Sequence, residues 1–423
     1  MDSRPEPDRK PVVPREENTR SAQGRAGSML AADAWLASPP PGSAVERWRT
    51  LAGACEEGGV QFHPDVLLDA GTGGEQPDLV FDLPGQDGEP GCVVLFSVRT
   101  FRAEPPLGVL LRKTLRGHAL IGTRPLGGGS EDARSLVRAA TEHLAARRSG
   151  FLWFESIDME SPLWRAILDP PPPARVLVAS QDEPHWRIRF PENPATYLEQ
   201  RLSSNMRRNL RVKQRDAQRK WGSELRLERF TEPEQVPSFL ETAARVAAKT
   251  WQFRRLGRGV QDNDATRALL RRLAELRALR SYVLFCGDSP IAYAVGYQWN
   301  GFFDYNETGY DPEYSSSSPG ELITWKMVDD LATVDPVRVV DFGPGHHEFK
   351  ARFGNENRPV ACAYLVTGAM PGALIRLDRR AREVQASVRS RVKEAANRLG
   401  IWKRLRQKYR GSSGPPVKPP VSR

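Results

Sequence analysis

From Tyr282 to Phe353 the hydrophobic and polar positions fall into blocks that predict a fixed order of elements. Three short strands come first, separated by turn residues at Gly287-Asp288 and at Gly301. These strands are expected at 282–285, 291–297 and 302–308. A serine-rich loop, a helix, a strand at Val337–Asp341 and a glycine-rich corner then follow.

The helix after the serine-rich loop has a well-marked start. Ser318 is expected as the N-cap and Pro319 as the first helical residue, where its missing N–H costs nothing. Glu321 is then placed to complete a capping box. Such a strand–loop–helix junction either cradles an anion through its N–H groups or is simply a stable helix N-terminus.

Two further groups of α and β elements precede this stretch. The earlier group spans 44–190 and includes a strand at 151–157, followed by separate strands at 174–179 and 185–190. Its glycine-rich segment Pro125–Ser130 lacks the Walker pattern, so we interpret it as a connector rather than a phosphate cradle. His63 is expected to pack or to cap a helix. The later group, 225–279, predicts one strand and then helices over 234–251 and 265–279, with a basic loop at 254–258 between them.

A strongly basic helix is predicted between the two groups, over Tyr197–Trp221. Leu202, Met206 and Leu210 recur at spacing four and form a docking face. The remaining surface carries arginine and lysine, which suits a solvated bridge between domains, a wall for the phosphates of a ligand or for an acidic substrate, or a nucleic-acid contact. No aromatic residues are interleaved to support base stacking.

The net charge of +10 (62 − 52) is concentrated in the C-terminal tail. Residues 371–423 hold 15 basic and 3 acidic side chains, a balance of +12, which leaves about −2 for the rest. The tail predicts a long amphipathic helix over 369–410, which either docks on the protein or lies on an anionic membrane surface. The segments 1–42 and 411–423 are expected to be disordered.

Several classes of protein are disfavoured by composition. No apolar run approaches the roughly 20 residues of a membrane span, and the N-terminal segment lacks a signal-peptide core, so a cytoplasmic location, with a peripheral membrane position as an option, is expected. The four cysteines have no metal spacing, so buried free thiols and no metal are expected. No nucleophilic Ser or Cys motif is present.

The chain resembles the GNAT superfamily of acyl-CoA N-acyltransferases. More narrowly, it is similar to the BioF2-like, or cellulose-biosynthesis-protein-like, acetyltransferase branch, which is related to the FemAB-type aminoacyl transferases. The resemblance covers about residues 47–366 and is carried by these motifs: Gly287-Asp288-Ser289-Pro290-Ile291-Ala292, Thr308-Gly309-Tyr310-Asp311, Ser318-Pro319-Gly320, Asp341-Phe342-Gly343 with Gly345, Phe349-Lys350 and Arg352-Phe353-Gly354.

The resemblance implies an α/β (α+β) fold of two GNAT-like halves with a basic C-terminal helix. We expect a degenerate N-terminal half at 43–195, a basic linking helix at 196–222 and the acyltransferase domain at 223–368. It also implies transfer of an acyl group, with acetyl as the expected one, from acetyl-CoA or another acyl-CoA to an amine of a sugar, lipid or amino-acid-type substrate, as in polysaccharide or envelope biosynthesis.

The resemblance and the residue types together give the expected site. Ser317, Ser318, Pro319 and Gly320 would face the pyrophosphate of acyl-CoA, although Glu321 would oppose a bound anion there. The candidate catalytic groups are Asp304 or Glu307 as general base, Tyr310 as proton donor to the thiolate, His347 and Lys350. Asp304 and Glu307 are three apart and are therefore expected on opposite faces of one strand. Lys350 would neutralise a substrate anion or pair with Asp341.

Two other functions fit the same pattern. Aminoacyl transfer from a charged tRNA would use the basic 201–220 surface and would depend strongly on salt. A fold without catalysis, acting as an interaction or membrane-surface module, would turn over no thioester but would still bind anionic lipid through its tail.

Overall fold

The computed structural model describes residues 28–31, 42–57, 60–69, 71, 77–83, 91–103, 113–147 and 150–398. Of the segment 1–42, where the sequence predicts disorder, Ser28–Ala31 form strand β1, which pairs with β2. The tail beyond residue 398, which includes the segment 411–423, lies outside the described residues.

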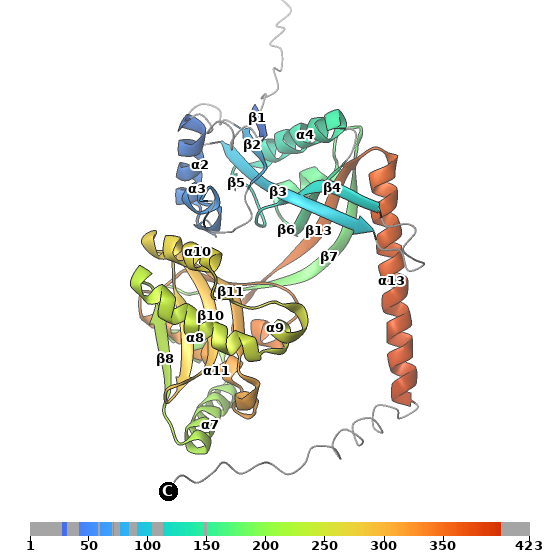
Figure 1. Ribbon diagram of the computed structural model, residues 1–423. Coiled ribbons are helices and arrows are strands. Elements are labelled where there is room, and N and C mark those ends of the chain that lie inside the picture. Colours follow the sequence, from blue (N-terminus) through green and yellow to red (C-terminus); the bar gives the residue numbers. More distant parts are fainter. Residues whose placement is uncertain are drawn as a thin grey trace, which may run out of the picture.

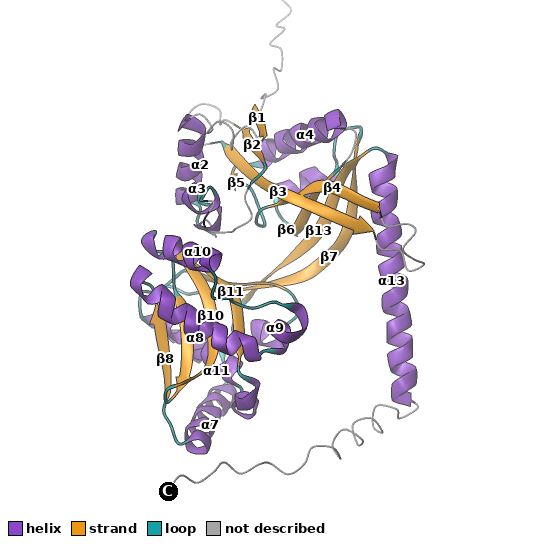
Figure 2. Cartoon of the chain, viewed as in Figure 1, coloured by secondary structure: helices purple, strands orange, loops and turns teal. Residues whose placement is uncertain are grey.

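One mixed sheet of thirteen strands runs through the described part of the chain (Figures 1 and 2). Its order is β1-β2-β3-β4-β6-β13-β7-β12-β11-β10-β9-β8, with β5 paired to β3. The sheet is thus continuous, while helices cover it in two groups that define an N-terminal and a C-terminal half. The mixed α/β fold expected from the sequence is confirmed.

The N-terminal half begins with α2 and ends with β7. Its elements are α2 (Gly42–Ala54), η1 (Val60–Phe62), α3 (Pro64–Leu67), β2 (Leu79–Leu83), β3 (Cys92–Ala103), β4 (Lys113–Leu120), β5 (Leu126–Gly127), α4 (Ser130–Arg147), β6 (Phe151–Asp158), α5 (Pro162–Leu168) and β7 (Ala174–Arg189).

The C-terminal half follows a short connection. Its elements are η4 (Pro194–Thr196), α6 (Tyr197–Arg201), α7 (Ser204–Trp221), β8 (Leu225–Phe230), η5 (Pro233–Gln235), α8 (Val236–Lys249), α9 (Trp251–Leu256), α10 (Asp264–Glu275), β9 (Ser281–Cys286), β10 (Ser289–Trp299), β11 (Phe302–Tyr310), η6 (Pro312–Ser317), α11 (Pro319–Thr333), β12 (Val339–Pro344), α12 (Glu348–Phe353), β13 (Glu356–Thr367) and the long helix α13 (Ala369–Arg398).

The two halves repeat one topology. In each, two antiparallel strands lead through a helix to a parallel strand: β3–β4–α4–β6 in the first half and β10–β11–α11–β12 in the second. The strand that ends each half pairs with the other half, because β7 pairs with β12 and β13 pairs with β6. Since β7 and β13 also pair with each other, the halves share the centre of the sheet.

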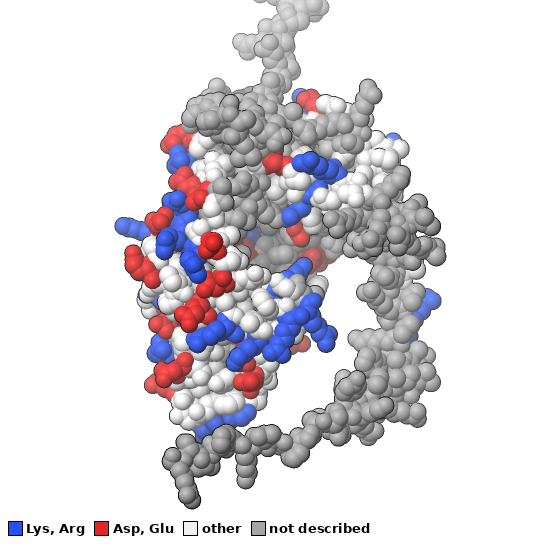
Figure 3. All heavy atoms as spheres, in the orientation of Figure 1, with Lys and Arg blue, Asp and Glu red and all other residues white. Residues whose placement is uncertain are grey.

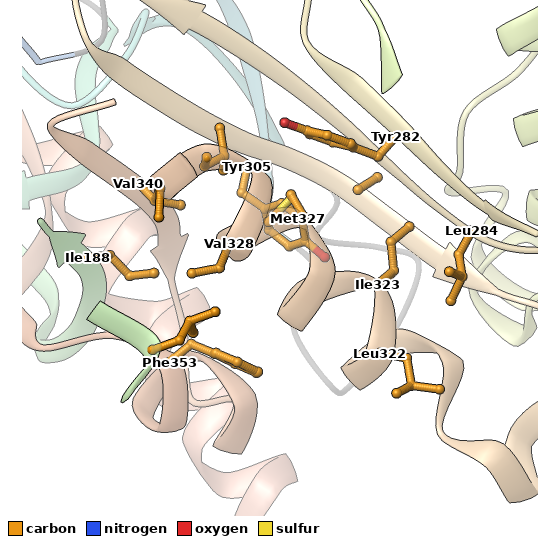
Figure 4. Close-up of a cluster of buried hydrophobic side chains, with 14 of the residues drawn as sticks. Ile188, Tyr282, Leu284, Tyr305, Leu322, Ile323, Met327, Val328, Val340 and Phe353 are labelled. Carbon is orange, nitrogen blue, oxygen red and sulfur yellow. The ribbon is translucent and has the colours of Figure 1, made fainter. Parts of the chain in front are cut away.

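Helix α11 packs its apolar residues on one face of the C-terminal sheet (Figure 4). Leu322, Ile323, Met327 and Val328 meet Tyr282 and Tyr305 from the strands. Helices α8 and α10 cover the opposite face, with Phe239 and Leu240 fully buried. This two-sided cover fixes the position of β11, the strand that carries the expected catalytic carboxylates.

Four local predictions were wrong. The predicted helix 197–221 is interrupted at Leu202–Ser203, because the Ser203 side chain accepts a hydrogen bond from the Met206 N–H and starts α7 anew. In the same way Thr250 ends α8 and caps α9, so that Arg254 and Arg255 lie on a helix rather than in a loop. The two strands predicted at 174–190 are one strand, β7.

The predicted capping box at Ser318 is the fourth of these corrections. Ser318 precedes α11 but has left-handed backbone angles (φ 52°, ψ 54°), and its side chain makes no capping hydrogen bond. Glu321 instead forms ion pairs with Lys213 and Arg352. Pro319 does lie in the first turn, and the capping role considered for His63 is confirmed, since its Nδ1 accepts from the Asp65 N–H.

Candidate active site

Strands β11 and β12 pair at their N-terminal ends and then separate. They pair in parallel through only three positions: Phe302 with Val339, Phe303 with Val340 and Asp304 with Asp341. Beyond this point β11 continues along β10 to Tyr310, while β12 turns at Gly343 and continues along β7. The last paired positions, Asp304 and Asp341, therefore stand where the sheet opens.

Asp341 is held by three hydrogen bonds. His185 Nε2 donates to Oδ1 at 2.6 Å and Arg187 Nε to Oδ2 at 2.9 Å, and the Gly343 N–H donates to Oδ1 at 2.6 Å. Burial alone would raise the pKa of Asp341, but these donors and the charges of His185 and Arg187 lower it to about 2. Asp341 is therefore a fixed negative charge at neutral pH.

Asp304 has the opposite electrostatic environment. Burial, reinforced by the negative charge of Asp341, raises its pKa to about 7, against the opposing effects of Arg187 and a hydrogen bond from Gln61. The side chain is nevertheless half-buried rather than sealed. A partly accessible carboxyl group that titrates near neutral pH is suited to accept a proton from a bound amine.

Asp304 and Glu307 lie on the same face of β11, which corrects the expectation that they face opposite ways. A register shift between Val295 and Gly296 inserts an extra residue in β11, so that Val295 pairs with Glu307 and Tyr297 with Asp304. Both partners belong to the core under α8 and α10. One residue of bulge is enough to bring the two carboxylates onto one face.

Glu307 has two strong hydrogen-bond donors. Its Oε1 accepts from the Tyr293 hydroxyl at 2.6 Å and from the Val260 N–H at 2.5 Å. These bonds tie the segment after α9 to the strand. Glu307 thus has a structural role, and Asp304 is the better candidate for the general base.

The loop before α11 is held by the basic helix α7. Lys220 Nζ donates to Ser316 Oγ at 2.6 Å, and Trp221 Nε1 donates to Ser317 Oγ at 3.4 Å. The rings of Trp221 and Tyr314 lie 4.4 Å apart. Helix α7 therefore packs beside the expected phosphate-facing loop and belongs to the C-terminal half.

The charge of Glu321 at the start of α11 is more than balanced. Lys213 from α7 and Arg352 from α12 both pair with its carboxylate, which leaves a local balance of +1. The conflict expected between Glu321 and a bound anion is thereby reduced.

Tyr310 and Gly320 are neighbours across this opening. A β-carbon built on Gly320 would lie 3.3 Å from Cδ1 of Tyr310, so a larger side chain would displace the ring. Tyr310 ends β11 and is exposed. The expected proton donor and the expected cofactor-facing glycine are therefore brought together by the fold.

His347 and Lys350 lie at the start of α12, and Lys350 is close enough to Asp341 for the charge of that carboxylate to act on it. His347 is exposed, with its ring 5.9 Å from that of Phe349. Lys350 is buried and donates to the carbonyl oxygens of Gly343 at 3.2 Å and Pro344 at 2.7 Å rather than to Asp341, which corrects the pairing that we considered. Burial lowers the pKa of Lys350.

Sequence reasoning missed a group of charges at the junction of the halves. Glu57 Oε2 accepts from Arg187 at 3.0 Å, and Glu57 also pairs with Arg124, Arg189 and Arg358. Burial opposes ionisation of Glu57, but the arginines lower its pKa overall. The alternation His185, Arg187, Arg189 along β7 was the one available signal, because alternate residues share a face.

A polar cavity of about 860 Å³ opens beside these charges. Arg187 and Arg358 form one wall, and the Gly127–Gly129 turn with Asp132 at the start of α4 forms another. The glycine-rich segment interpreted as a connector therefore lines a cavity. Arg187 links this cavity to the site, because its side chain lines the cavity and also donates to Asp341.

Within the described residues, no group of His, Cys, Asp and Glu side chains could hold a metal ion. Among the helices of this same part of the chain, none is long and apolar enough to cross a membrane.

The fold and this opening between parallel strands define a GNAT-type acyltransferase fold. Residues 204–351 match the family model for the acetyltransferase (GNAT) domain. The chain therefore carries a GNAT-type acetyltransferase domain, and the resemblance to that superfamily is confirmed. Among curated proteins, none matches the chain.

Solved structures share the wider arrangement at low identity. The crystal structure of FemX is 12% identical, with a TM-score of 0.51, and the match covers 77% of this chain and 96% of FemX. A tandem GNAT protein from the clavulanic acid biosynthesis pathway is 13% identical, with a TM-score of 0.37, over 81% of this chain and 98% of that one. L-PGS from Bacillus licheniformis is 12% identical, with a TM-score of 0.44, over 70% and 87%. The FemX likeness extends beyond the GNAT domain and thus includes both halves of the fold.

Proposed function

We propose that the protein transfers an acyl group from an acyl-CoA thioester to an amine at the opening between β11 and β12, with Asp304 as the general base. The observation that carries this proposal is the Asp304–Asp341 pair. Its two carboxylates stand at the end of the shared register with pKa values of about 7 and about 2. Environments that separate the pKa values of neighbouring carboxyl groups are a mark of acid–base sites.

The chemical step is a direct transfer. The amine nitrogen attacks the thioester carbonyl carbon and loses a proton to the Asp304 carboxylate, and the carbon–sulfur bond breaks. The leaving thiolate takes a proton from solvent, because Tyr310 lies six residues beyond Asp304 on β11, beside Gly320 at the phosphate end of the expected donor site. The products are an amide and the CoA thiol, and Asp304 returns its proton to solvent.

The acyl donor would lie along the free edge of β11, with its phosphates toward Ser317, Ser318, Pro319 and Gly320. Support comes from the two cations around Glu321 and from the contact between Lys220 and Ser316, which place positive charge beside that loop. The helix dipole of α11 adds to this attraction for an anion.

The acceptor would reach Asp304 from the polar cavity of about 860 Å³. Its lining includes Asp158 and Glu160 as well as the arginines. A cavity with both kinds of charge fits a polar amine with further hydroxyl, phosphate or carboxylate groups, such as an amino sugar or an amino acid derivative.

The test measures release of the CoA thiol from acetyl-CoA in the presence of each amine of a panel of amino sugars, amino acids and amino lipids. The proposal predicts turnover with at least one amine class and its loss in Asp304→Asn. Glu228→Gln, an exposed carboxylate on β8, is the matched control and should keep full activity. If Asp304→Asn is as active as the control, Asp304 is not the base.

A different surface of the protein supports a second kind of acyl donor. Exposed basic side chains gather over α8 and α9 (Figure 3). They are Arg245, Lys249, Arg254, Arg255 and Arg258. Helix α9 begins with the exposed Trp251. An exposed aromatic ring among cations suits the single-stranded end of an RNA, so aminoacyl transfer from charged tRNA is the alternative. It predicts RNA binding that weakens steeply with salt and is lost in Trp251→Ala with Arg254→Ala.

A further inference from the structure

A second cavity, of about 930 Å³, lies on the N-terminal half, away from Asp304. Its floor is formed by aromatic and aliphatic side chains of β3, β6, β7 and β13, and helix α13 forms one side. Trp153 and Tyr364, both in its lining, have nearly parallel rings with centroids 5.9 Å apart. The other apolar lining includes Phe101, Leu177 and Ile375.

The two faces of this part of the sheet are covered differently. On the face under α4 and α5, Phe154 and Ala363 are completely buried. On the face toward the cavity, their sequence neighbours Trp153 and Tyr364 are only half-buried. Helix α13 touches this face at its first turns, through Leu374 and Ile375, and then runs away from the sheet (Figure 1). Among the described residues, this apolar floor is thus left without a full protein cover.

The rim of the cavity is positively charged. Arg99, Arg376 and Arg379 line it against the single carboxylate of Asp378, a balance of +2 (3 − 1). Arg379 is anchored, since it donates to the Val178 carbonyl oxygen and pairs with Glu383 at 3.2 Å. Arg376 is exposed. An apolar interior with an arginine mouth is complementary to a long acyl chain that ends in an anionic head.

Helix α13 indicates where such a ligand would come from. Met370, Leu377 and Val384 follow at spacing seven and therefore form one stripe, on the opposite side of the helix from the buried Ile375. All three are exposed, at 52%, 51% and 60%. The exposed Arg380 and Arg391 lie along the same helix. An apolar stripe flanked by arginines suits the surface of an anionic bilayer.

We propose that α13 lies on an anionic membrane and that the adjoining cavity receives an acyl chain of an anionic phospholipid, with Arg376 and Arg379 at its head group. The site does not share residues with the acyl-transfer site. Failure of either proposal therefore leaves the other standing.

The test uses the full chain with vesicles of phosphatidylcholine, with and without phosphatidylglycerol. Flotation should require phosphatidylglycerol and be lost in Leu377→Glu, whereas Leu168→Glu, an equally exposed leucine on α5, should float normally. Arg376→Glu should weaken binding on the order of tenfold, and Arg138→Glu at an exposed position on α4 should not. Equal flotation of Leu377→Glu and wild type would contradict the proposal.

The cavity itself is tested by fluorescence quenching with phosphatidylglycerol brominated on its acyl chains. Quenching should occur in the wild type and fall in Trp153→Phe, because Trp153 lines the cavity. Identical quenching in both would overturn the cavity assignment. Quenching of Trp153 by brominated fatty acid monomers, without quenching by vesicles, would also overturn the assignment. The ligand would then be a free amphiphile and not a membrane lipid. The protein could instead form a dimer that Leu377→Glu dissociates while vesicle binding stays unchanged. That result would show that the apolar stripe of α13 contacts a second copy of the chain and would contradict the proposal.

Discussion

Asp304 and Asp341 are opposing residues of the last parallel pair between β11 and β12, and the fold gives them opposite acidities. His185, Arg187 and the Gly343 N–H stabilise the charge on Asp341, whereas burial beside that charge destabilises ionised Asp304. In the proposed function these two like groups on neighbouring strands have different roles: Asp341 is a permanent anion, and Asp304 accepts a proton near neutral pH.

The first prediction concerns the pH dependence of turnover. Because Asp304 must be deprotonated to act as base and its pKa is about 7, the acyl-transfer rate should rise with pH through that value. Asp304→Asn should lower kcat by about 10²- to 10⁴-fold and remove this titration. The measurement is kcat against pH by thiol release. A wild-type profile that is flat between about pH 6 and pH 8 would argue against Asp304.

The second prediction concerns stability at the same position. A carboxyl group whose pKa is raised in the folded state binds more protons there than in the unfolded state, so stability falls as pH rises between about 4 and about 7. Asp304→Asn removes this penalty. Its Tm should be close to that of the wild type at about pH 4 and exceed it at about pH 8. If the difference in Tm between Asp304→Asn and the wild type is the same at both pH values, the pKa of Asp304 is not raised.

The third prediction concerns the charges between the halves. Glu57→Gln leaves Arg124, Arg187, Arg189 and Arg358 without their shared carboxylate, so the free energy of unfolding should fall by about 3 kcal/mol. Denaturant unfolding measures this. The control Glu228→Gln breaks an exposed pair with Arg226 and should cost less than about 1 kcal/mol. Similar losses in the two variants would mean that Glu57 does not hold the junction.

The fourth prediction concerns the charge at the start of α11. Replacing Lys213 and Arg352 by methionine leaves the carboxylate of Glu321 alone beside the expected phosphate site, so affinity for acetyl-CoA should fall by about tenfold or more. Adding Glu321→Gln to the double variant should restore part of that affinity. Calorimetry measures all three proteins. No recovery on adding Glu321→Gln would show that the two cations act in another way.

The sequence was sufficient for features that depend on short-range pattern. The strands 282–285, 291–297 and 302–308 and the helix from Pro319 are confirmed to within a few residues. Their apolar spacing and turn glycines are local signals. The two-half fold followed from the resemblance of several motifs taken together.

Features decided by distant partners could not be predicted in this way. The capping box at Ser318 failed because Lys213, over a hundred residues away, competes for Glu321. The bulge that turns Glu307 to the face of Asp304 leaves no mark in β11 that pattern reasoning can detect. Glu57 and Arg358 meet across 301 positions of sequence, so their pairing depends on the tertiary fold alone.

The most direct test of the acyl-CoA assignment is calorimetric binding of acetyl-CoA to the wild type, Gly320→Trp and Gly53→Trp. Gly320 touches Tyr310 at the opening, whereas a β-carbon at the exposed Gly53 meets nothing within 4 Å, so Gly53→Trp controls for the size of the change. The account predicts saturable binding to the wild type and the control and none to Gly320→Trp. Absence of binding to the wild type, or equal binding to all three proteins, would contradict a donor site at the start of α11.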